Sequence, residues 1–309
     1  MTDHDGVPAI GPGNPSLTTR ALVRERLERR QRNYQFDPVV VFALLAEPDV
    51  APRCLDAAFG AAQAVDGRIV ALHVGYHPAH VWTSAEETAL QGLRERREGT
   101  PDQRLALIRA AFDEWRHADP VRADAAWRDG EGDVESCVDR EAEKADLLVV
   151  VHPGNLDASD ALHAAIFQSR RLVLVAPRRA EPPRRGPLTR HVMIGWKPGD
   201  HARRAIAAAA PWLKAAGELT VVCVNEPADR PYRPSIATLL ADLGLPPRIE
   251  CVTASNESVG ACLLRQADLL DASCLVTGAF KHGPLLELVL GGVTHDLLAR
   301  AEIPLLMMH

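Results

Sequence analysis

The sequence predicts an α/β fold in which two successive domains each hold a parallel sheet between layers of helices. Short runs rich in Val, Ile and Leu alternate with amphipathic helical stretches, which is the pattern of strands joined by crossover helices. The pattern also repeats, because residues 67–74 (GRIVALHV) resemble residues 217–224 (GELTVVCV) at an offset of 217 − 67 = 150. A repeat of this length indicates a duplicated domain. Residues 178–190, rich in Pro and Arg, are typical of a linker between the copies.

Length and composition narrow the class of protein. The chain has 309 residues, enough for two domains, and its 35 basic against 41 acidic residues give a net charge of −6. This charge argues against nucleic-acid binding, which depends on Lys and Arg. No apolar run approaches the ~18 residues of a membrane helix, and the acidic start Met1–Gly6 lacks the apolar centre of a signal peptide. We expect a cytoplasmic protein without a membrane span.

Residues 1–36 precede the first domain as a Gly- and Pro-rich tail and a short basic helix, Leu17 to Gln35. A basic helix can dock on an anionic membrane or on RNA, or it can lie solvated across its own protein. Glu25 and Glu28 interrupt the positive charge and favour the solvated helix.

The first domain is expected over residues 37–177, with five strands that alternate with helices. Its first apolar run suits a strand buried on both faces, and the spacing of three and four between apolar residues marks the helices. The expected strands are Val39–Leu45, Arg68–Val74, Ala123–Trp127, Leu147–Val151 and Leu172–Ala176. The expected helices are Cys54–Val65, Ser84–Arg97, Asp102–Ala118, Val134–Ala145 and Ala158–Ser169.

The second domain, residues 191–309, follows the same pattern. Its expected strands are Val192–Trp196, Leu219–Val224, Arg248–Val252, a run that ends at Gly278, and Leu305–Met308. Helices are expected over Ala202–Ala216, Ser235–Leu243, Asn256–Ala267 and after Gly291.

The junction between Gly278 and the helix that follows Gly291-Gly292 is the best candidate site. A strand, a loop and a helix start leave backbone N–H groups unpaired, and such groups bind phosphate. The segment Gly278-Ala279-Phe280-Lys281, nine residues, and Gly291-Gly292-Val293-Thr294 resembles the universal stress protein signature. In that family Gly-x-x-Gly, nine residues and Gly-Ser or Gly-Thr wrap the phosphates of ATP. Lys281 and Gly292 depart from it, and Thr294 could supply the missing hydroxyl or cap the helix.

This resemblance extends over about Asp37 to His309 and implies a tandem universal stress protein. It implies two flavodoxin-like (adenine nucleotide alpha hydrolase-like) domains with five-stranded parallel sheets of order 3-2-1-4-5. Ligands of such sheets bind where strands one and four diverge. We expect the final strands, Leu172–Ala176 and Leu305–Met308, to face each other, so that the two domains form a pseudo-dimer. The whole chain could also form a homodimer.

In the second domain this crevice places Trp196-Lys197-Pro198-Gly199-Asp200 opposite residues 278–294, and Lys197 stands where nucleotide-binding relatives have an aspartate. The candidate ligand-binding residues are Lys197, Gly199, Val222, Gly278, Lys281, Gly291, Gly292, Val293 and Thr294. Lys197 and Lys281 can pair with phosphates, or both can be solvated around an empty pocket. In the first domain Val150–Gly154 replaces the loop and no Gly-Gly follows, so no nucleotide is expected there.

Two other residue groups were considered for metal or redox chemistry. His73, His77 and His80, with His152, offer zinc ligands, but Pro78 prevents a regular helical presentation and surface histidines are the simpler interpretation. No metal site is predicted. The six cysteines contain no C-x-x-C pair and are expected to be buried free thiols.

No catalytic residue is predicted, because the chain has no Gly-x-Ser-x-Gly elbow and no Gly-x-x-x-x-Gly-Lys-Ser/Thr loop. The hypothesis is a non-enzymatic stress-response or signalling module that binds ATP, AMP or another anion in its second domain and signals to an unidentified protein partner. The alternatives are a weak ATP hydrolase and a scaffold without ligand.

Overall fold

The computed structural model describes residues 38–75, 92–93, 95–178, 186–225, 233–254, 256–279 and 292–309, and residues Val39 to His309 form one compact unit. Several predictions fall outside the described residues. They concern the tail and basic helix, most of the helix Ser84–Arg97, and His77, His80, Lys281 and Gly291. The part of the chain that is described contains no helix long and apolar enough to cross a membrane.

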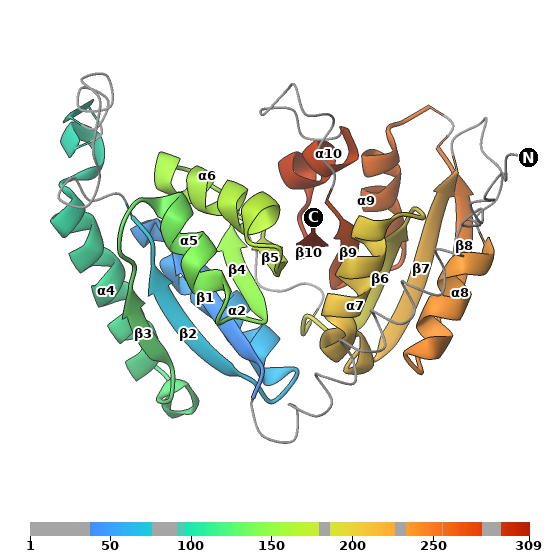
Figure 1. The fold of residues 1–309 in the computed structure, drawn as a ribbon, viewed down its shortest axis with the longest axis horizontal. Coiled ribbons are helices and arrows are strands. Elements are labelled where there is room, and N and C mark those ends of the chain that lie inside the picture. The colour runs from blue at the N-terminus through green and yellow to red at the C-terminus, as the bar shows by residue number, and fades with distance from the viewer. Residues whose placement is uncertain are drawn as a thin grey trace, which may run out of the picture. The chain divides into compact units, whose positions relative to one another are not determined.

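The front half, residues 39–177, contains strands one to five of the sheet (Figure 1). The strands are β1 (Val40–Leu45), β2 (Arg68–His73), β3 (Ala126–Asp129), β4 (Leu147–Val151) and β5 (Leu172–Ala176). The helices are α2 (Ala51–Gln63), α4 (Pro101–His117), α5 (Val134–Ala142) and α6 (Leu156–His163). Short turns of 3-10 helix lie at Pro48–Val50 and Pro120–Arg122, and a π-helical turn lies at Ala164–Gln168.

The rear half, residues 191–309, repeats this order of elements. Its strands are β6 (His191–Trp196), β7 (Glu218–Asn225), β8 (Arg248–Thr253), β9 (Cys274–Gly278) and β10 (Leu305–Met308). Its helices are α7 (Asp200–Lys214), α8 (Arg233–Asp242), α9 (Val259–Leu269) and α10 (Gly292–Arg300).

The ten strands form one sheet of order β3-β2-β1-β4-β5-β10-β9-β6-β7-β8. Within each half the pairs are parallel and the order is 3-2-1-4-5, which confirms the predicted fold class. The halves meet at the antiparallel pair β5–β10, where Leu174 lies opposite Leu306. The expectation that the two final strands face each other is therefore confirmed.

A single hydrophobic core crosses this junction on one face of the sheet. Side chains of β5 and β10, among them Val173, Val175, Leu305 and Met307, belong to one buried cluster that includes residues of α5 and α9. The strands β4, β5, β9 and β10 are buried at every residue, because helices cover both faces of the sheet.

Equivalent positions of the two halves can be matched from the strand register. Val40 and His191 begin β1 and β6, so the offset for this part of the repeat is 191 − 40 = 151. In both halves the residue before the fourth strand accepts a hydrogen bond from the first residue of the first strand. Val40 N–H donates to Asp146 Oδ2, and His191 N–H donates to Ser273 Oγ, each over 3.0 Å.

The helices α2 and α7 follow the same offset and meet across the junction. Trp212 of α7 is fully buried and donates its indole N–H to the Ala61 carbonyl of α2 over 2.8 Å. Because 212 − 151 = 61, these two residues occupy equivalent positions, and the large side chain of one half contacts the backbone of its small counterpart in the other.

Several described elements differ from their predicted bounds by up to three residues, and two of these differences have a clear local cause. The third strand begins at Ala126 instead of Ala123, because Asp119 caps a 3-10 turn over Pro120–Arg122 that delays the strand. The helix predicted over Ala158–Ser169 starts earlier, at Leu156, and ends in the π-helical turn, where Ser169 N–H donates to the Ala164 carbonyl.

Candidate functional site

The order 3-2-1-4-5 leaves one crevice in each half, where the first and fourth strands end and their connections leave in opposite directions. In the front half this is the C-terminal edge of β1 and β4, and in the rear half that of β6 and β9. The two crevices are equivalent by position, but their side chains differ.

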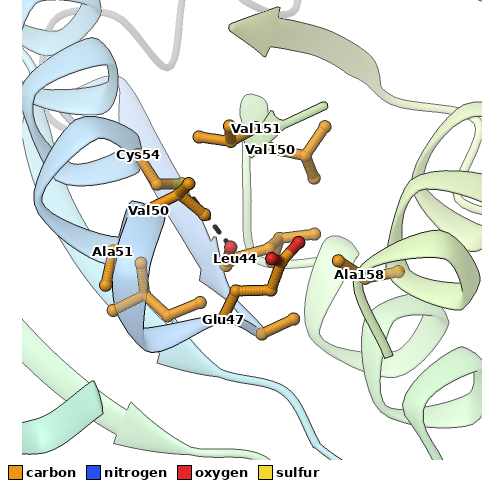
Figure 2. A pocket seen from close by; sticks show the side chains of 11 residues that line it. Leu44, Glu47, Val50, Ala51, Cys54, Val150, Val151 and Ala158 are labelled. Carbon is orange, nitrogen blue, oxygen red and sulfur yellow. Dashed lines mark hydrogen bonds between the residues drawn. The ribbon is translucent and has the colours of Figure 1, made fainter. Parts of the chain in front are cut away.

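The front crevice is almost completely filled, and Figure 2 shows the side chains that line it. Its cavity has a volume of about 10 Å³, which is room for one water molecule at most. Side chains of β1, β4 and the helices that follow them line it. They are Leu44, Leu45, Ala46, Glu47, Val50, Ala51, Cys54, Val150, Val151, Ala158 and Ala161.

Glu47 is the charged residue of this crevice, and its side chain is only 7% exposed. Its carboxylate accepts a hydrogen bond from the Gly154 N–H over 2.6 Å and two from Arg178 Nη1 over 2.8 and 3.0 Å. Arg178 lies directly over Gly154, since a Cβ at residue 154 would come within 2.3 Å of the guanidinium. A side chain at residue 154 would therefore displace the Arg178 guanidinium from this position.

Among the described residues of the rear half, no carboxylate stands at the equivalent position. With the offset of 151, Pro198 stands at the position of Glu47, and the exposed Lys197 stands at the position of Ala46. Gly199 is the N-cap residue of α7 and provides no side-chain cap for the first amides of that helix.

Gly278 lies against the start of α7. A Cβ at residue 278 would lie 2.8 Å from the Ala202 nitrogen and 3.0 Å from the His201 carbonyl carbon. Close packing of β9 on the first turn of α7 therefore requires glycine here, whatever the ligand. The contact also brings two predicted site residues, Gly199 and Gly278, to the same corner of the rear half.

Three further predicted residues form the first turn of α10. Gly292 is exposed, Val293 is half-buried, and Thr294 is only 1% exposed. Thr294, considered either as the missing hydroxyl or as a helix cap, lies within α10 (Gly292–Arg300).

Val222 is the predicted site residue that lies farthest inside the protein. It is fully buried in β7 and belongs to the core cluster with Leu263 and Leu275. Lys281 and Gly291 are outside the described residues, so the loop between β9 and α10 has no described geometry.

Sequence reasoning missed two buried polar groups at the C-terminal edge of the rear sheet. Trp196 ends β6, Asn225 ends β7, and neither Trp196 Nε1 nor Asn225 Oδ1 has a hydrogen-bond partner among the described residues. A buried polar atom without a partner is costly, so each is a point where a ligand or a loop can bind. Trp196 was predicted at the end of a strand that borders the crevice, and Asn225 just beyond the strand Leu219–Val224, but neither was a candidate ligand-binding residue.

A histidine pair lies on the rim of the rear crevice. The ring centroids of His201, in the first turn of α7, and His309 are 4.4 Å apart, and His309 Nδ1 lies 3.0 Å from the Ala279 carbonyl oxygen. Burial lowers the pKa of His201, and the neighbouring His309 and Arg204 lower it further. His201 is therefore biased toward its neutral form.

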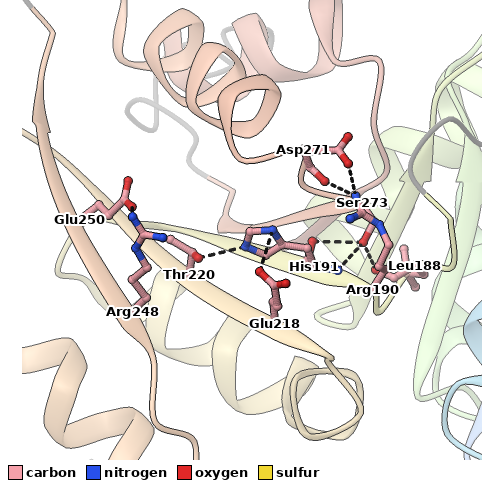
Figure 3. A network of polar contacts seen from close by, with 9 residues as sticks. All are labelled: Leu188, Arg190, His191, Glu218, Thr220, Arg248, Glu250, Asp271 and Ser273. Carbon is pink, nitrogen blue, oxygen red and sulfur yellow. Dashed lines mark hydrogen bonds and ion pairs between the residues drawn. The ribbon is translucent and has the colours of Figure 1, made fainter.

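A second polar network lies at the opposite, N-terminal edge of the rear sheet (Figure 3). His191 Nε2 lies 2.9 Å from Thr220 Oγ1, and His191 Nδ1 lies 3.6 Å from Glu218 Oε2. This order of groups resembles a hydroxyl nucleophile with its base and acid, but Thr220 is buried and no substrate can reach it. Ser273 Oγ donates to the Leu188 carbonyl in the same network, so we interpret it as structural.

No group of three His, Cys, Asp or Glu side chains that could hold a metal ion occurs in the ranges that the structure describes. Five of the six cysteines are buried and Cys251 is half-buried, and all six are free thiols. The prediction of free thiols is confirmed, and that of complete burial holds for five of them.

Comparisons with known proteins give a match in structure and none in sequence. No family model matches the chain, and no curated protein matches it. A universal stress protein from Archaeoglobus fulgidus DSM 4304 is similar in structure, with a TM-score of 0.54 and 15% identity, over 87% of this chain and 97% of that one. The chain has the universal stress protein fold.

A protein of unknown function from Pseudomonas aeruginosa PAO1 is also similar in structure. Its TM-score is 0.50 with 16% identity, over 89% of this chain and 94% of that one. Because identities are this low, the likeness concerns the arrangement of helices and strands in both halves. The chemistry of the crevices has to be inferred from this chain's own residues.

Proposed function

We propose that the protein is a cytoplasmic stress-response or signalling module whose rear half binds a small anion. The first candidates for this anion are ATP and AMP. In this proposal the ligand lies between Lys197 and Gly199 on one side and the start of α10 on the other. Its presence is passed to a protein partner through the two joined halves. The domain division that belongs to the proposal is 37–177, a linker at 178–190, and 191–309.

The observation that carries the proposal is the difference between the two crevices. In the front half the carboxylate of Glu47 already binds the backbone amide of Gly154 and the guanidinium of Arg178. In the rear half Pro198 stands at the position of Glu47. Backbone amides at a glycine-rich helix start attract anions irrespective of the neighbouring side chains. The buried Trp196 indole, which has no described partner, adds a hydrogen-bond donor at the same edge of the sheet.

The experiment measures what the purified protein carries and what it binds. Mass spectrometry of small molecules released on denaturation should detect an adenine nucleotide, and titration calorimetry should give its affinity. Gly291→Val should abolish binding, because a side chain there blocks the approach of the backbone to phosphate.

Gly60→Val is the matched control, since a Cβ at residue 60 meets no atom within 4 Å. That variant should bind as the wild type does. If the wild type neither carries nor binds any nucleotide, the proposed site is wrong and a scaffold without ligand is favoured. Phosphate release from ATP that stops in Gly291→Val would instead identify a hydrolase.

A further inference from the structure

The ion pair between Glu47 and Arg178 distinguishes the front half from the rear half, but it does not contact the ligand proposed above for the rear half. It lies in the front half at the switch point of the sheet, where it closes the crevice between β1 and β4. Glu47 lies two residues after the end of β1, with Ala46 between them, and Arg178 lies two residues after the end of β5. Residues 131 positions apart thus meet at the point where sheets of this type bind ligands.

The groups around the Glu47 carboxylate are those that bind oxyanions. The Gly154 N–H follows β4 and points at one carboxylate oxygen, while Arg178 Nη1 donates to both oxygens. Backbone amides and arginine together are a common protein site for phosphate and sulfate, and bonds to a charged partner are the strong ones. Asn155 completes the loop, because its side chain donates to the Ala46 carbonyl and accepts from the Ala158 N–H.

We propose that this cradle is a latent oxyanion site, which the protein keeps closed by occupying it with the carboxylate of Glu47. The ligand class is a small phosphate-like anion, and the residues that would hold it are Gly154 and Arg178. In the wild-type protein the carboxylate is attached to the chain, so its effective concentration exceeds that of any free anion. The front half therefore binds no free anion as long as Glu47 is present.

The geometry of the cradle would allow a free anion to take the place of the Glu47 carboxylate. Glu47 reaches the cradle with one side chain from a 3-10 turn, and its removal would join the vacated volume to the small cavity beside it. The side chain of Arg178 is 36% exposed, so one side of the cradle faces solvent and an anion can enter. This inference concerns the front half only and does not depend on the proposed rear site.

The test compares four proteins with inorganic phosphate as the probe: the wild type, Glu47→Ala, Glu47→Gln, and Glu47→Ala combined with Arg178→Met. Binding is measured by calorimetry and by the rise in melting temperature with phosphate over chloride at equal ionic strength. Any binding at the rear site is common to all four proteins and cancels in the comparison.

Glu47→Ala should bind phosphate at least about tenfold more tightly than the wild type, because the cradle is open and Arg178, which keeps its hydrogen bond to the His152 carbonyl, has lost its carboxylate partner. The double variant has the open space without the cation and should lose this gain. Glu47→Gln keeps the space filled and should bind no better than the wild type.

The proposal is overturned if folded Glu47→Ala gains no phosphate binding, if the double variant keeps the gain, or if Glu47→Gln shows it too. Should Glu47→Ala fail to fold in chloride, phosphate is expected to restore folding in this variant and not in the double variant. Absence of that rescue would also count against the latent site. A nucleotide result at the rear site leaves each of these outcomes unchanged.

Discussion

At the scale of single residues, the two halves differ most in the side chains that fill the crevice between β1 and β4 of the front half. Glu47 follows β1 and Arg178 follows β5, so four strands separate the two residues in the sequence. Neither residue belongs to a motif, and a sequence contains no signal that pairs them. The sequence did predict that the front half lacks the phosphate loop, but the structure adds the reason why its crevice is closed.

His73, at the end of β2, makes stability depend on pH. Burial lowers its pKa below the ordinary 6.5, Asp129 and Asp157 partly oppose this, and Arg104 adds to it. A histidine with a lowered folded pKa binds its proton more readily when unfolded, so its contribution to stability is complete above 6.5 and is lost as the pH falls below that value. We expect the free energy of unfolding to fall as the pH drops through this window.

Replacing His73 with Gln should reduce the pH dependence of the unfolding free energy, measured by urea denaturation at a series of pH values. The slope is the informative quantity, because the substitution also changes packing. The exposed His117, replaced in the same way, is the control and should leave the slope as in the wild type. An unchanged slope for His73→Gln would show that other groups cause the pH dependence.

At the scale of elements, burial decides which segments could be predicted from the sequence. The strands β4, β5 and β10 were predicted with correct bounds, because continuous apolar runs are forced by a sheet covered on both faces. The third strand was misplaced because it is an outer strand with mostly exposed residues and no clear pattern. The role of Gly278 was only partly predictable, since its contact with α7 depends on residues far apart in the sequence.

The pairing of β5 with β10 predicts the cost of a charge at the junction. Val173→Lys or Leu306→Lys places an ammonium group in a fully buried position with no acidic partner on the paired strand. Each should lower the free energy of unfolding by about 3 kcal/mol or more. Denaturant titration measures the effect, and Leu156→Lys, at an exposed position of α6, should change it little. Wild-type stability in both buried variants would contradict the observed packing.

At the scale of the whole molecule, the two halves are joined by a sheet pair and by a helix pair. Trp212 is the largest fully buried side chain at this junction, and its partner Ala61 is its own counterpart in the repeat. Two large or two small residues at these positions would not fill the same space. Duplication followed by divergence therefore allowed an asymmetric contact that identical copies cannot make.

Trp212→Ala should lower the free energy of unfolding by about 3–5 kcal/mol, because it leaves a cavity between α2 and α7. Trp212→Phe keeps much of the volume but removes the donor to the Ala61 carbonyl, and should cost less. Thermal and denaturant unfolding measure both, and Trp127→Phe, at the partly exposed outer strand β3, is the control. A smaller loss for Trp212→Ala than for Trp212→Phe would refute the role of this contact.

The antiparallel pair β5–β10 has a consequence for how the protein behaves in dilute solution. Because both strands belong to one polypeptide, their association is intramolecular and its equilibrium does not change with protein concentration. Two separate subunits joined by the same contact would come apart as they are diluted. Here the two halves of the sheet stay joined at any expression level, and a cell with few copies of the chain contains the same folded unit as a cell with many.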